Sequence, residues 1–359
     1  MSPPRAEIDR MTSITVCLRP FRAAGPRLDA EWIGDAFVVH NYGHGGSGWS
    51  LSWGSSTIAV RKAMAASPGS VAVIGCGALG LTSAILAQRA GAKVTLYARE
   101  FLPDTRSARA TGSWSPDSRI ALADAAGPGF AALWEQMART SFETYRAALH
   151  LPGNPIERSE SYAIFDRSIE DRRSLAPPLD PLGFGSYQHA IEDLTPGWQP
   201  APAGTTPFDA PYVYRSDGLT FNIADYGRML MDDFRAAGGA LCRMEFHAPA
   251  ELAQLPQKTI INCPGYGARA LWNDRSVTPV RGQIAWLPAQ PELTYSAQYD
   301  TVYMLARRDG IVVQATGGGD MNGYGDESET PDRAEAERAV ADLAELYARF
   351  GKACLPPRP

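Results

Sequence analysis

The chain has 359 residues, of which 45% are apolar and 20% are charged, and its formal net charge is −5 at pH 7. This length exceeds one ordinary hydrophobic core, so we expect two closely packed globular domains. The sequence has no basic block and no run of about 18 apolar residues, which argues against nucleic acid and membranes as partners. The N-terminus has no apolar signal-peptide core, and we therefore expect a cytoplasmic location.

Five cysteines are scattered through the sequence without the C-x-x-C spacing of a zinc or redox site. An odd number without regular spacing argues against a disulfide framework, so we interpret them as small core residues. No cluster of His, Cys and Asp predicts a metal site. The cysteines are Cys17, Cys76, Cys242, Cys263 and Cys354.

The first part of the chain alternates like short strands, at Ile14–Leu18, Arg27–Trp32 and Phe37–His40. The segment HNYGHGGSGW follows, in which glycines lie between ring side chains. This pattern suits backbone that lies close to a flat ligand. A flexible loop is the alternative, but it does not explain the interleaved His, Tyr and Trp. Ser55–Ala66 then has the pattern of a helix.

Ser70–Glu100 predicts a strand, a glycine turn, a helix and a second strand. The turn has the pattern G-x-G-x-x-G, and each of its three glycines has a distinct structural function. Gly75 permits the tight turn, Gly77 lets backbone approach a pyrophosphate, and Gly80 lets helix and strand pack closely. The N-terminus of the helix supplies free N–H groups for the phosphates. In this context the motif predicts a bound dinucleotide.

The end of the second strand leaves the identity of the dinucleotide open. The pattern expects an acid here to bind a ribose hydroxyl, and Glu100 can do so. Arg99 precedes it and can instead meet a 2′-phosphate, which would indicate NADP.

The remaining elements are predicted from apolar spacing and turn residues. They combine a parallel-sheet nucleotide domain with a mostly antiparallel, strand-rich second domain, which is a mixed α/β fold. Helices are expected at Phe130–Leu149, at Leu219–Ala236 with Asn222 as a plausible N-cap, and at Pro331–Phe350; strands at Ser161–Asp166, Lys258–Cys263, Val280–Leu287, Thr301–Ala306 and Ile311–Thr316; and a proline-rich loop at Pro177–Pro211.

These segments resemble the D-amino-acid oxidases, FAD enzymes of the glycine/D-amino-acid oxidase fold. VIGCGALGLTSA, VTLYAREFLPD and ATGSWSPDS resemble that family's N-terminal FAD segments, and TIINCPGYGARAL and VRGQIAWL its middle segments. YDTVYMLARRDGIVVQATGGG resembles its substrate-domain hairpin. LRPFRAAGPRLDAE and VVHNYGHGGSGWSLSWGSS resemble its closing segments. The resemblance covers most of the chain apart from about residues 120–210.

The order of these segments departs from the family, because its C-terminal segments occupy residues 17–56 here. The chain therefore looks circularly permuted, with the same fold cut and rejoined through Ser67–Gly69. The expected division is 1–66 as the permuted segment, 67–160 and 219–280 as the Rossmann-type FAD domain, and 161–218 and 281–359 as the substrate domain.

The resemblance implies oxidation of an amino acid by hydride transfer to a non-covalent FAD, with O2 as the electron acceptor. It assigns Arg22 as the carboxylate anchor, because a guanidinium matches a carboxylate bidentately, and leaves Arg19 as structural. The hydroxyl of Tyr303 is expected to contact the same substrate carboxylate, and Tyr299 is expected to act as a lid. A spacing of four along one strand would put both tyrosines on one face.

The resemblance also implies a set of FAD contacts, some of which depart from the family's residues. Arg99 occupies the position where the family has its ribose-binding acid. Arg106 replaces a residue that is often a hydroxyl residue in the family, and Ser113 replaces an aliphatic one. Backbone N–H groups of the glycine-rich loop are expected to stabilise charge on the ring. The expected cofactor residues are Gly43, Gly45, Gly46, Ser47, Gly48, Trp49, Ser50, Gly75, Gly77, Ala78, Leu79, Gly80, Arg99, Glu100, Thr105, Arg106, Ser107, Gly112, Ser113, Cys263 and Gly265.

Three alternatives remain at this point. One is a flavin oxidase or dehydrogenase of another amine, such as a glycine- or sarcosine-like compound. The second is a non-catalytic flavin-binding protein, and the third is an NADP reductase that rests on Arg99 alone. The sequence leaves the substrate side chain, the electron acceptor and the oligomeric state open.

Overall fold

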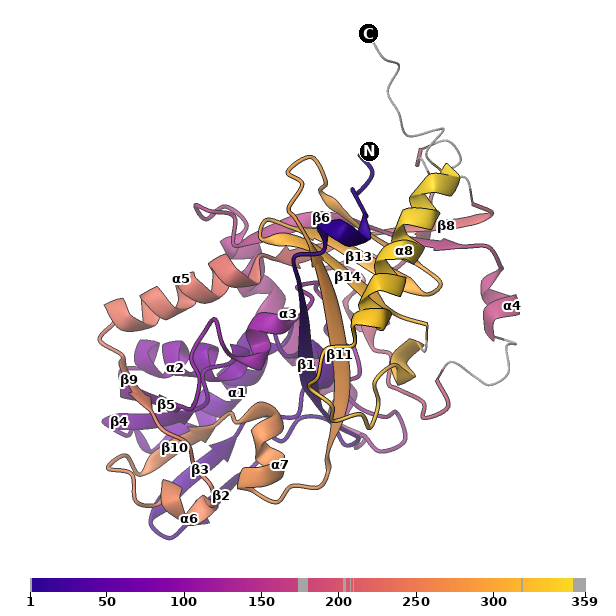
Figure 1. Cartoon of the computed structure of the whole chain (residues 1–359). Helices are drawn as coiled ribbons and strands as arrows, with labels where there is room; N and C mark the ends of the chain where they lie inside the picture. Colours follow the sequence, from indigo (N-terminus) through magenta and orange to yellow (C-terminus); the bar gives the residue numbers. More distant parts are fainter. Residues whose placement is uncertain are drawn as a thin grey trace.

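The computed structural model describes residues 2–173, 180–202, 205–206, 208, 210–317 and 319–350. Two β-sheets form its frame, and helices lie on the faces of both (Figure 1). This arrangement confirms the predicted mixed α/β class. In the described part of the chain, no helix is both long and apolar enough to cross a membrane.

A six-stranded sheet carries the glycine turn at its centre. Its order is β2-β3-β10-β4-β5-β9; β2 is antiparallel to β3, and all the other pairs are parallel. Its central strands are buried apolar runs, as a parallel sheet covered on both faces requires. The strands are β2 (Ala30–Ile33), β3 (Ala36–His40), β4 (Ser70–Ile74), β5 (Lys93–Ala98), β9 (Ala240–Arg243) and β10 (Thr259–Asn262).

Helices cover the faces of this sheet. α1 packs against α2 and α3, and α2 also packs against α5. Their apolar side chains share one core with Val71, Val73 and Leu96 of the strands. The helices of the molecule are α1 (Ser52–Ala63), α2 (Ala78–Arg89), α3 (Phe130–Ala148), α4 (Ile169–Arg173), α5 (Ile223–Ala236), α6 (Pro249–Leu252), α7 (Ala268–Leu271) and α8 (Arg333–Phe350).

An eight-stranded, mostly antiparallel sheet forms the second layer, in the order β1-β11-β14-β13-β12-β6-β8-β7. The long pairing of β1 with β11 runs from Ser13↔Trp286 to Arg22↔Val277, so it joins opposite parts of the chain. The strands are β1 (Ser13–Arg22), β6 (Ile156–Phe165), β7 (Gln199–Pro200), β8 (Tyr212–Phe221), β11 (Val277–Leu287), β12 (Tyr295–Tyr299), β13 (Val302–Arg307) and β14 (Gly310–Ala315).

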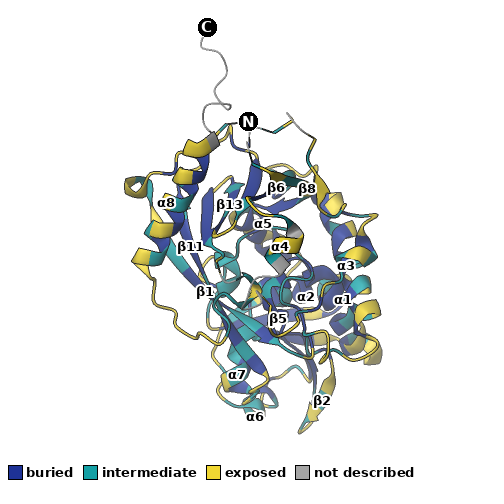
Figure 2. Cartoon of the chain, turned by 90° about the vertical axis from the view of Figure 1, so that its right-hand side faces the viewer, coloured by how far each residue is buried: buried dark blue, intermediate teal, exposed yellow. Residues whose placement is uncertain are grey.

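The two faces of the second sheet have different surroundings. α8 packs on one face through Val340, Leu343 and Leu346, whose spacing of three places them on one side of the helix. Ile311 and Val313 of β14 point toward α8, and the intervening Val312 belongs to a separate cluster. Side chains alternate across a strand, so Val312 marks the face turned away from α8. Figure 2 shows the outer side of α8 exposed.

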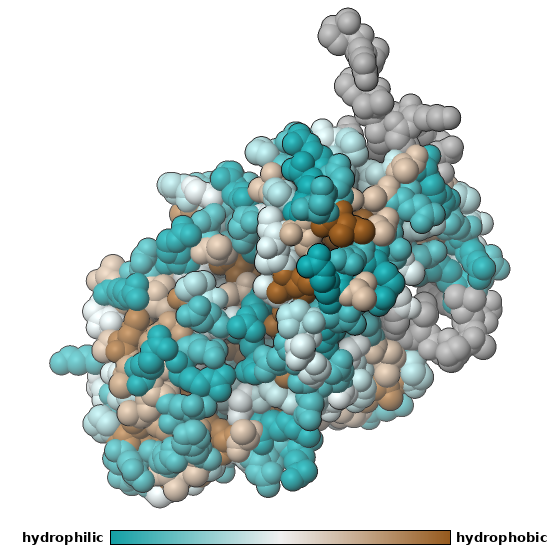
Figure 3. All heavy atoms as spheres, viewed as in Figure 1, coloured by the Kyte–Doolittle hydropathy of each residue, from teal (hydrophilic) through white to brown (hydrophobic). Residues whose placement is uncertain are grey.

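The N-terminal segments belong to both sheets. β1 forms the edge of the second sheet, and β3 lies beside β10 in the first. The hydroxyl of Tyr295 donates a hydrogen bond to the carbonyl of Ser2 at 2.9 Å and lies 2.7 Å from the hydroxyl of Tyr347 in α8. The start of the chain therefore meets the end of the last helix. On the face seen in Figure 3, apolar residues form small, separate patches among hydrophilic ones.

Some predicted elements differ from the structure. Leu219 to Phe221 extend β8, and the helix begins only at Ile223, because these residues pair with β6. Asn222 occupies the N-cap position but makes no capping hydrogen bond; its amide bonds Asn154 and Glu157 instead. β7, β8, β9 and β12 were not predicted as strands. Three of them are short, and β8 contains the turn-type residues Ser216, Asp217 and Gly218. Cys354 and parts of Pro177–Pro211 lie outside the described residues.

Candidate functional site

A cavity of about 580 Å³ runs between the two sheets. One end lies at the carboxyl ends of the parallel strands β4, β5 and β10, which is where open α/β sheets bind ligands. The other end is lined by strands of the second sheet, including β1, β11, β13 and β14. The predicted cofactor residues that line it are Gly45, Gly46, Gly48, Trp49, Ser50, Gly75, Gly77, Ala78, Leu79, Arg99, Glu100, Thr105, Arg106, Ser107, Gly112, Ser113, Cys263 and Gly265.

The glycine turn has the geometry that its motif predicts. Gly75 has a φ of +95°, in the left-handed region that favours glycine. A Cβ on Gly80 would come within 1.8 Å of the carbonyl oxygen of Gly75, so the close packing of α2 on the turn requires glycine there. Gly80 therefore lies behind the lining rather than in it. The backbone N–H of Ala78 donates to the hydroxyl of Ser107 at 3.0 Å.

The end of β5 carries a compact charge cluster. Arg99 donates to Glu245 at 3.1 Å and lies 3.2 Å from a carboxylate oxygen of Glu100. The hydrogen bond to Glu245 and the nearby acid raise the pKa of Arg99, although partial burial opposes this. Two carboxylates thus neutralise Arg99, which leaves little charge for the 2′-phosphate of NADP. Glu245 comes from the segment after β9, and Arg106 in the same lining pairs with Glu329.

The glycine-rich loop packs tightly against residues 118 and 119. Gly45 has a φ of +53°, and a Cβ there would come within 1.8 Å of the carbonyl oxygen of Arg119. The N–H of Gly46 donates to Ser118 at 2.9 Å, and the N–H of Ser47 donates to His44 at 2.9 Å. These two N–H groups are therefore already used, which does not agree with their predicted role at the ring.

Two predicted loop residues lie outside the lining. Gly43 packs against Arg22, because a Cβ at Gly43 would come within 2.4 Å of Cδ of that arginine. The Ser47 hydroxyl is buried and donates to the carbonyl of Ser118 at 3.1 Å. Trp49, which does line the cavity, donates its indole N–H to the carbonyl of Ser107 at 2.8 Å and so joins the loop to the residue that bonds Ala78 of the glycine turn.

The lining fits a dinucleotide cofactor. Glycine backbone approaches the cavity from the turn after β4, from the loop after β3 and from Gly265 after β10. Two buried polar atoms of lining residues, Oγ1 of Thr105 and Nδ1 of His44, have no hydrogen-bond partner among the described residues. A ligand with phosphate oxygens and ring nitrogens offers partners of the type that such atoms need.

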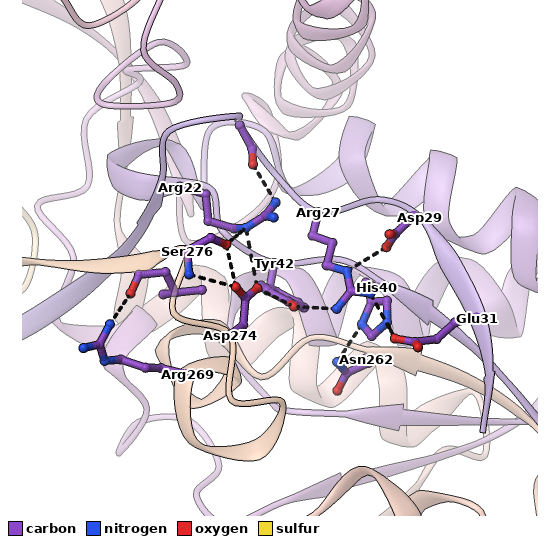
Figure 4. Close-up of polar contacts among 12 residues, drawn as sticks. Arg22, Arg27, Asp29, Glu31, His40, Tyr42, Asn262, Arg269, Asp274 and Ser276 are labelled. Atoms are coloured by element: carbon purple, nitrogen blue, oxygen red, sulfur yellow. Dashed lines mark hydrogen bonds and ion pairs between the residues drawn. The ribbon is translucent and has the colours of Figure 1, made fainter. Parts of the chain in front are cut away.

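Arg22 does not line this cavity, contrary to the prediction. Its Nε donates to the hydroxyl of Ser276 at 2.9 Å and lies 3.6 Å from Asp274, and its Nη1 donates to Gly25 at 3.0 Å (Figure 4). Burial disfavours the charge of Asp274, but hydrogen bonds from Ser276 and Tyr42 outweigh it and lower the pKa of that carboxyl. Arg22 thus ties the end of β1 to the segment before β11.

Arg19, three residues earlier, is the arginine of β1 that lines the cavity. Residues three apart on a strand point to opposite faces, so the side chains of Arg19 and Arg22 leave β1 in opposite directions. The guanidinium of Arg19 lies against Gly282 of β11, where a Cβ would come within 2.5 Å of its Nη2. Among the described residues, no carboxylate forms an ion pair with Arg19.

Tyr303 and Tyr299 do not share a face, contrary to the prediction. Asp300 and Thr301 form a turn between them, so Tyr299 ends β12 and Tyr303 lies in β13. Tyr303 lines the cavity, and burial raises the pKa of its hydroxyl, which bonds to Ser296 and Ser113. Tyr299 packs on the α8 side and donates to Asp166 at 2.5 Å.

Several lining residues were not predicted. Gln298 lies beside Tyr303 through the β12–β13 register, and Gln314 lies opposite it in β14. Their signal is the alternation of these strands, once the register is known. Arg119 comes from an irregular segment with no periodic signal, and the stretch Met244–His247 follows a short strand that the sequence does not mark.

Comparison with known proteins gives the family. The model of the DAO family, described as FAD dependent oxidoreductase, matches residues 70–355. A D-amino-acid oxidase of Dictyostelium discoideum is 24% identical over 283 residues, which cover 78% of this chain and 73% of that protein. A D-amino-acid oxidase of Streptomyces coelicolor is 29% identical over 223 residues, which cover 60% of this chain and 58% of that relative.

A solved structure agrees with this at the level of the fold. The crystal structure of glycine oxidase from Geobacillus kaustophilus aligns with a TM-score of 0.55 at 14% identity, over 79% of each chain. The family match begins at Ser70 and so leaves the N-terminal segments, including the glycine-rich loop, outside it. Since the match spans most of the chain and the cavity fits the cofactor, this protein belongs to the DAO family of FAD-dependent oxidoreductases.

Proposed function

We propose that this protein is an oxidase of D-amino acids. The observation that carries the proposal is the position of Arg19 and Tyr303 in the same cavity as the glycine cradle for FAD. The names of the two relatives described above, both D-amino-acid oxidases, support the substrate class and its stereochemistry. When bound, FAD accepts the hydride that leaves Cα and passes the electrons to O2, which yields hydrogen peroxide.

The cofactor would be held along the whole cavity. The glycine turn offers the positive end of the helix dipole to the pyrophosphate, together with its N–H groups other than those of Gly75 and Ala78, which bond Tyr97 and Ser107. Glu100 would accept a hydrogen bond from a ribose hydroxyl, and Thr105 and Ser107 would supply hydroxyl groups near the phosphates. Gly45, Gly46, Gly48, Gly112 and Ser113 would lie beside the flavin ring.

Arg19 would bind the substrate carboxylate. Its planar guanidinium can donate two parallel hydrogen bonds to a carboxylate, which fixes both position and orientation. The acids among the lining residues, Glu100 and Glu245, lie at the opposite end, after β5 and β9, so neither competes for Arg19. Tyr303 then donates its hydroxyl to the same carboxylate, and the substrate Cα is aimed at the ring.

The products follow from the chemistry of an α-amino acid. Loss of a hydride from Cα and a proton from the amino group gives an imino acid, and water converts it to a 2-oxo acid and ammonia. Arg19 and Tyr303 contact only the carboxylate, so they act by binding and orienting the substrate rather than by moving a proton.

The experiment begins with the absorbance spectrum of the purified protein, followed by anaerobic mixing with D-amino acids, L-amino acids and glycine. We expect a yellow protein that bleaches with D-amino acids and loses the bleaching in Arg19→Ala but retains it in Arg22→Ala. If only glycine or N-methylated amines bleach the flavin, the substrate is another amine and the D-amino-acid assignment is wrong. A yellow protein that no amine bleaches would contradict the oxidase proposal and favour a binding role.

A further inference from the structure

Arg119 is one of the arginines that line the cavity together with Arg19. Its side chain is only 13% exposed. Its backbone has a φ of +48°, in the left-handed region that arginine rarely adopts. Such a conformation persists only when the surrounding structure holds it, and it is frequent at functional sites.

The surroundings of Arg119 explain how it is held. Its carbonyl oxygen lies against Gly45, and the preceding carbonyl of Ser118 accepts the N–H of Gly46 at 2.9 Å. On the other side, Nε donates to the carbonyl of Asp320 at 2.7 Å and Nη2 to that of Gly319 at 3.1 Å. Arg119 is thus fixed between the loop at the flavin and the segment after β14.

The charges of the other lining arginines are balanced by nearby acids. Arg99 bonds Glu245 at 3.1 Å, and Arg281 bonds Glu335 at 2.9 Å. Arg106 pairs with Glu329. These three ion pairs leave their guanidinium groups little net attraction for a further anion. These close ion pairs distinguish Arg99, Arg106 and Arg281 from the other two arginines of the cavity.

Arg19 and Arg119 are the other two arginines of the cavity. Among the described residues, Arg119 has only a longer ion pair, with the half-exposed Asp320 at 3.6 Å, and no carboxylate pairs with Arg19. Burial and the positive charge of Arg19 lower the pKa of Arg119 to about 10, so it stays protonated at neutral pH. Two cations that repel each other in a cavity are stabilised by bound anions.

We propose that Arg19 and Arg119 bind the two carboxylates of one substrate, which makes an acidic D-amino acid the preferred substrate. This inference rests on the proposed function and deepens it. Arg19 binds the α-carboxylate and Arg119 the side-chain carboxylate. The neighbouring lining residues Ser113, Ser115 and Gln298 are polar, which suits a charged side chain better than a large apolar one.

The experiment compares matched pairs of substrates on the FAD-loaded enzyme. D-aspartate is set against D-asparagine and D-glutamate against D-glutamine, since each pair differs only in the side-chain charge. We expect kcat/KM to favour the acid by about 10- to 100-fold, the usual effect of a hydrogen-bonded charge pair. Arg119→Gln should remove this preference, while Arg139→Gln, an arginine on the outside of α3, should keep it.

A binding measurement provides a readout that does not depend on turnover. Malonate should raise the melting temperature of the wild-type enzyme more than acetate does at equal ionic strength, because it engages both guanidinium groups. In Arg119→Gln the two anions should act alike. Arg119→Lys should restore part of the difference, because it keeps the charge without the fork.

The outcomes separate this inference from the proposed function. If neutral D-amino acids reduce the flavin as well as acidic ones do, the inference is wrong and the oxidase proposal stands. If Arg119→Gln slows acidic and neutral substrates equally, both arginines share one carboxylate, which also overturns the inference. If no amino acid reduces the flavin, the proposed function fails and the inference fails with it.

Discussion

The guanidinium of Arg19 lies directly against the backbone of Gly282, on the strand next to its own. A Cβ built on Gly282 would come within 2.5 Å of Nη2 and 2.6 Å of Cζ of Arg19. The atoms that a methyl group would meet are the flexible end of a side chain, so the fold can tolerate it, but the guanidinium must move. The position of the proposed anchor is thus set by the absence of a side chain on β11.

Gly282→Ala should therefore impair the reaction without unfolding the protein. We expect FAD content to be retained and kcat/KM for D-amino acids to fall about 10- to 100-fold, since a shift of about 1 Å at a binding group has effects of this size. Steady-state kinetics and the flavin spectrum check this. Gly218→Ala is the matched control, because that glycine of the same sheet has open space around it. Equal kinetics in the two variants would contradict the assignment of Arg19.

The choice between the two arginines shows what the sequence can and cannot predict. The segment LRPFR predicts a strand with an anchoring arginine, but Arg19 and Arg22 fall on opposite faces of that strand. The face that meets the cavity is decided by the pairing of Arg19 with Val280 and of Arg22 with Val277, which joins residues more than 250 positions apart. No local pattern contains that register.

Arg22→Ala should lower stability rather than activity. The variant loses hydrogen bonds to Ser276 and Gly25 and a close contact with Asp274. The side chains of Arg22 and Asp274 are only 17% and 14% exposed. We expect the free energy of unfolding to fall by about 1–3 kcal/mol. KM should stay within about three-fold of the wild-type value, because Arg22 is not among the residues that line the cavity.

Denaturant unfolding and steady-state kinetics on the same preparation test this prediction. Arg22→Lys separates charge from geometry, since lysine can keep the contact with Asp274 but not all of the guanidinium's hydrogen bonds. A large rise in KM with unchanged stability would restore Arg22 as the anchor and contradict the position that the structure gives it.

The parts of the site that were predicted well are local in sequence. The turn from Gly75 to Gly80, the strand before it and the helix after it follow from the spacing of glycines and apolar residues within one short segment. Arg119 is the opposite case. Its proposed role depends on contacts with Gly45 and Gly319 and on the charge of Arg19, which come from three distant parts of the chain.

The permuted order of the chain and the division into domain segments remain predictions. The meeting of Ser2 and Tyr347 at the hydroxyl of Tyr295 supports the permutation, because it brings the first described residue beside the last helix, α8. The pairing of β1 with β11 and of β3 with β10 supports it as well, since the early segments supply the edge strand of the second sheet and an internal strand of the first.

The two tyrosines of the β12–β13 hairpin should behave differently. Tyr303→Phe removes the hydroxyl that faces the cavity, and we expect kcat/KM to fall about 10-fold or more through a higher KM. Tyr299→Phe removes a hydroxyl bonded to Asp166 on the α8 side, and kcat/KM should change less than about two-fold. Kinetics of both variants with one D-amino acid are sufficient. Equal losses would mean that Tyr299 reaches the substrate after all.

His44 gives the stability of the protein a specific pH dependence. It is a buried residue of the cavity lining, and its Nε2 lies 2.7 Å from the hydroxyl of Ser55. Burial lowers the pKa of this histidine to about 3, whereas an unfolded histidine titrates near pH 6.5. Below about pH 6.5 the unfolded state binds a proton that the folded state does not, so stability is lost as the pH falls from about 6.5 toward 3.

The expected slope from this one group is at most about 1.4 kcal/mol per pH unit. Melting temperatures between pH 7 and pH 4 should therefore fall in the wild-type protein and fall less steeply in His44→Gln, which cannot take up a proton. His189→Gln, at an exposed histidine, is the control and should follow the wild type. If His44→Gln is as acid-sensitive as the wild type, titrating carboxylates rather than a buried neutral His44 cause the loss.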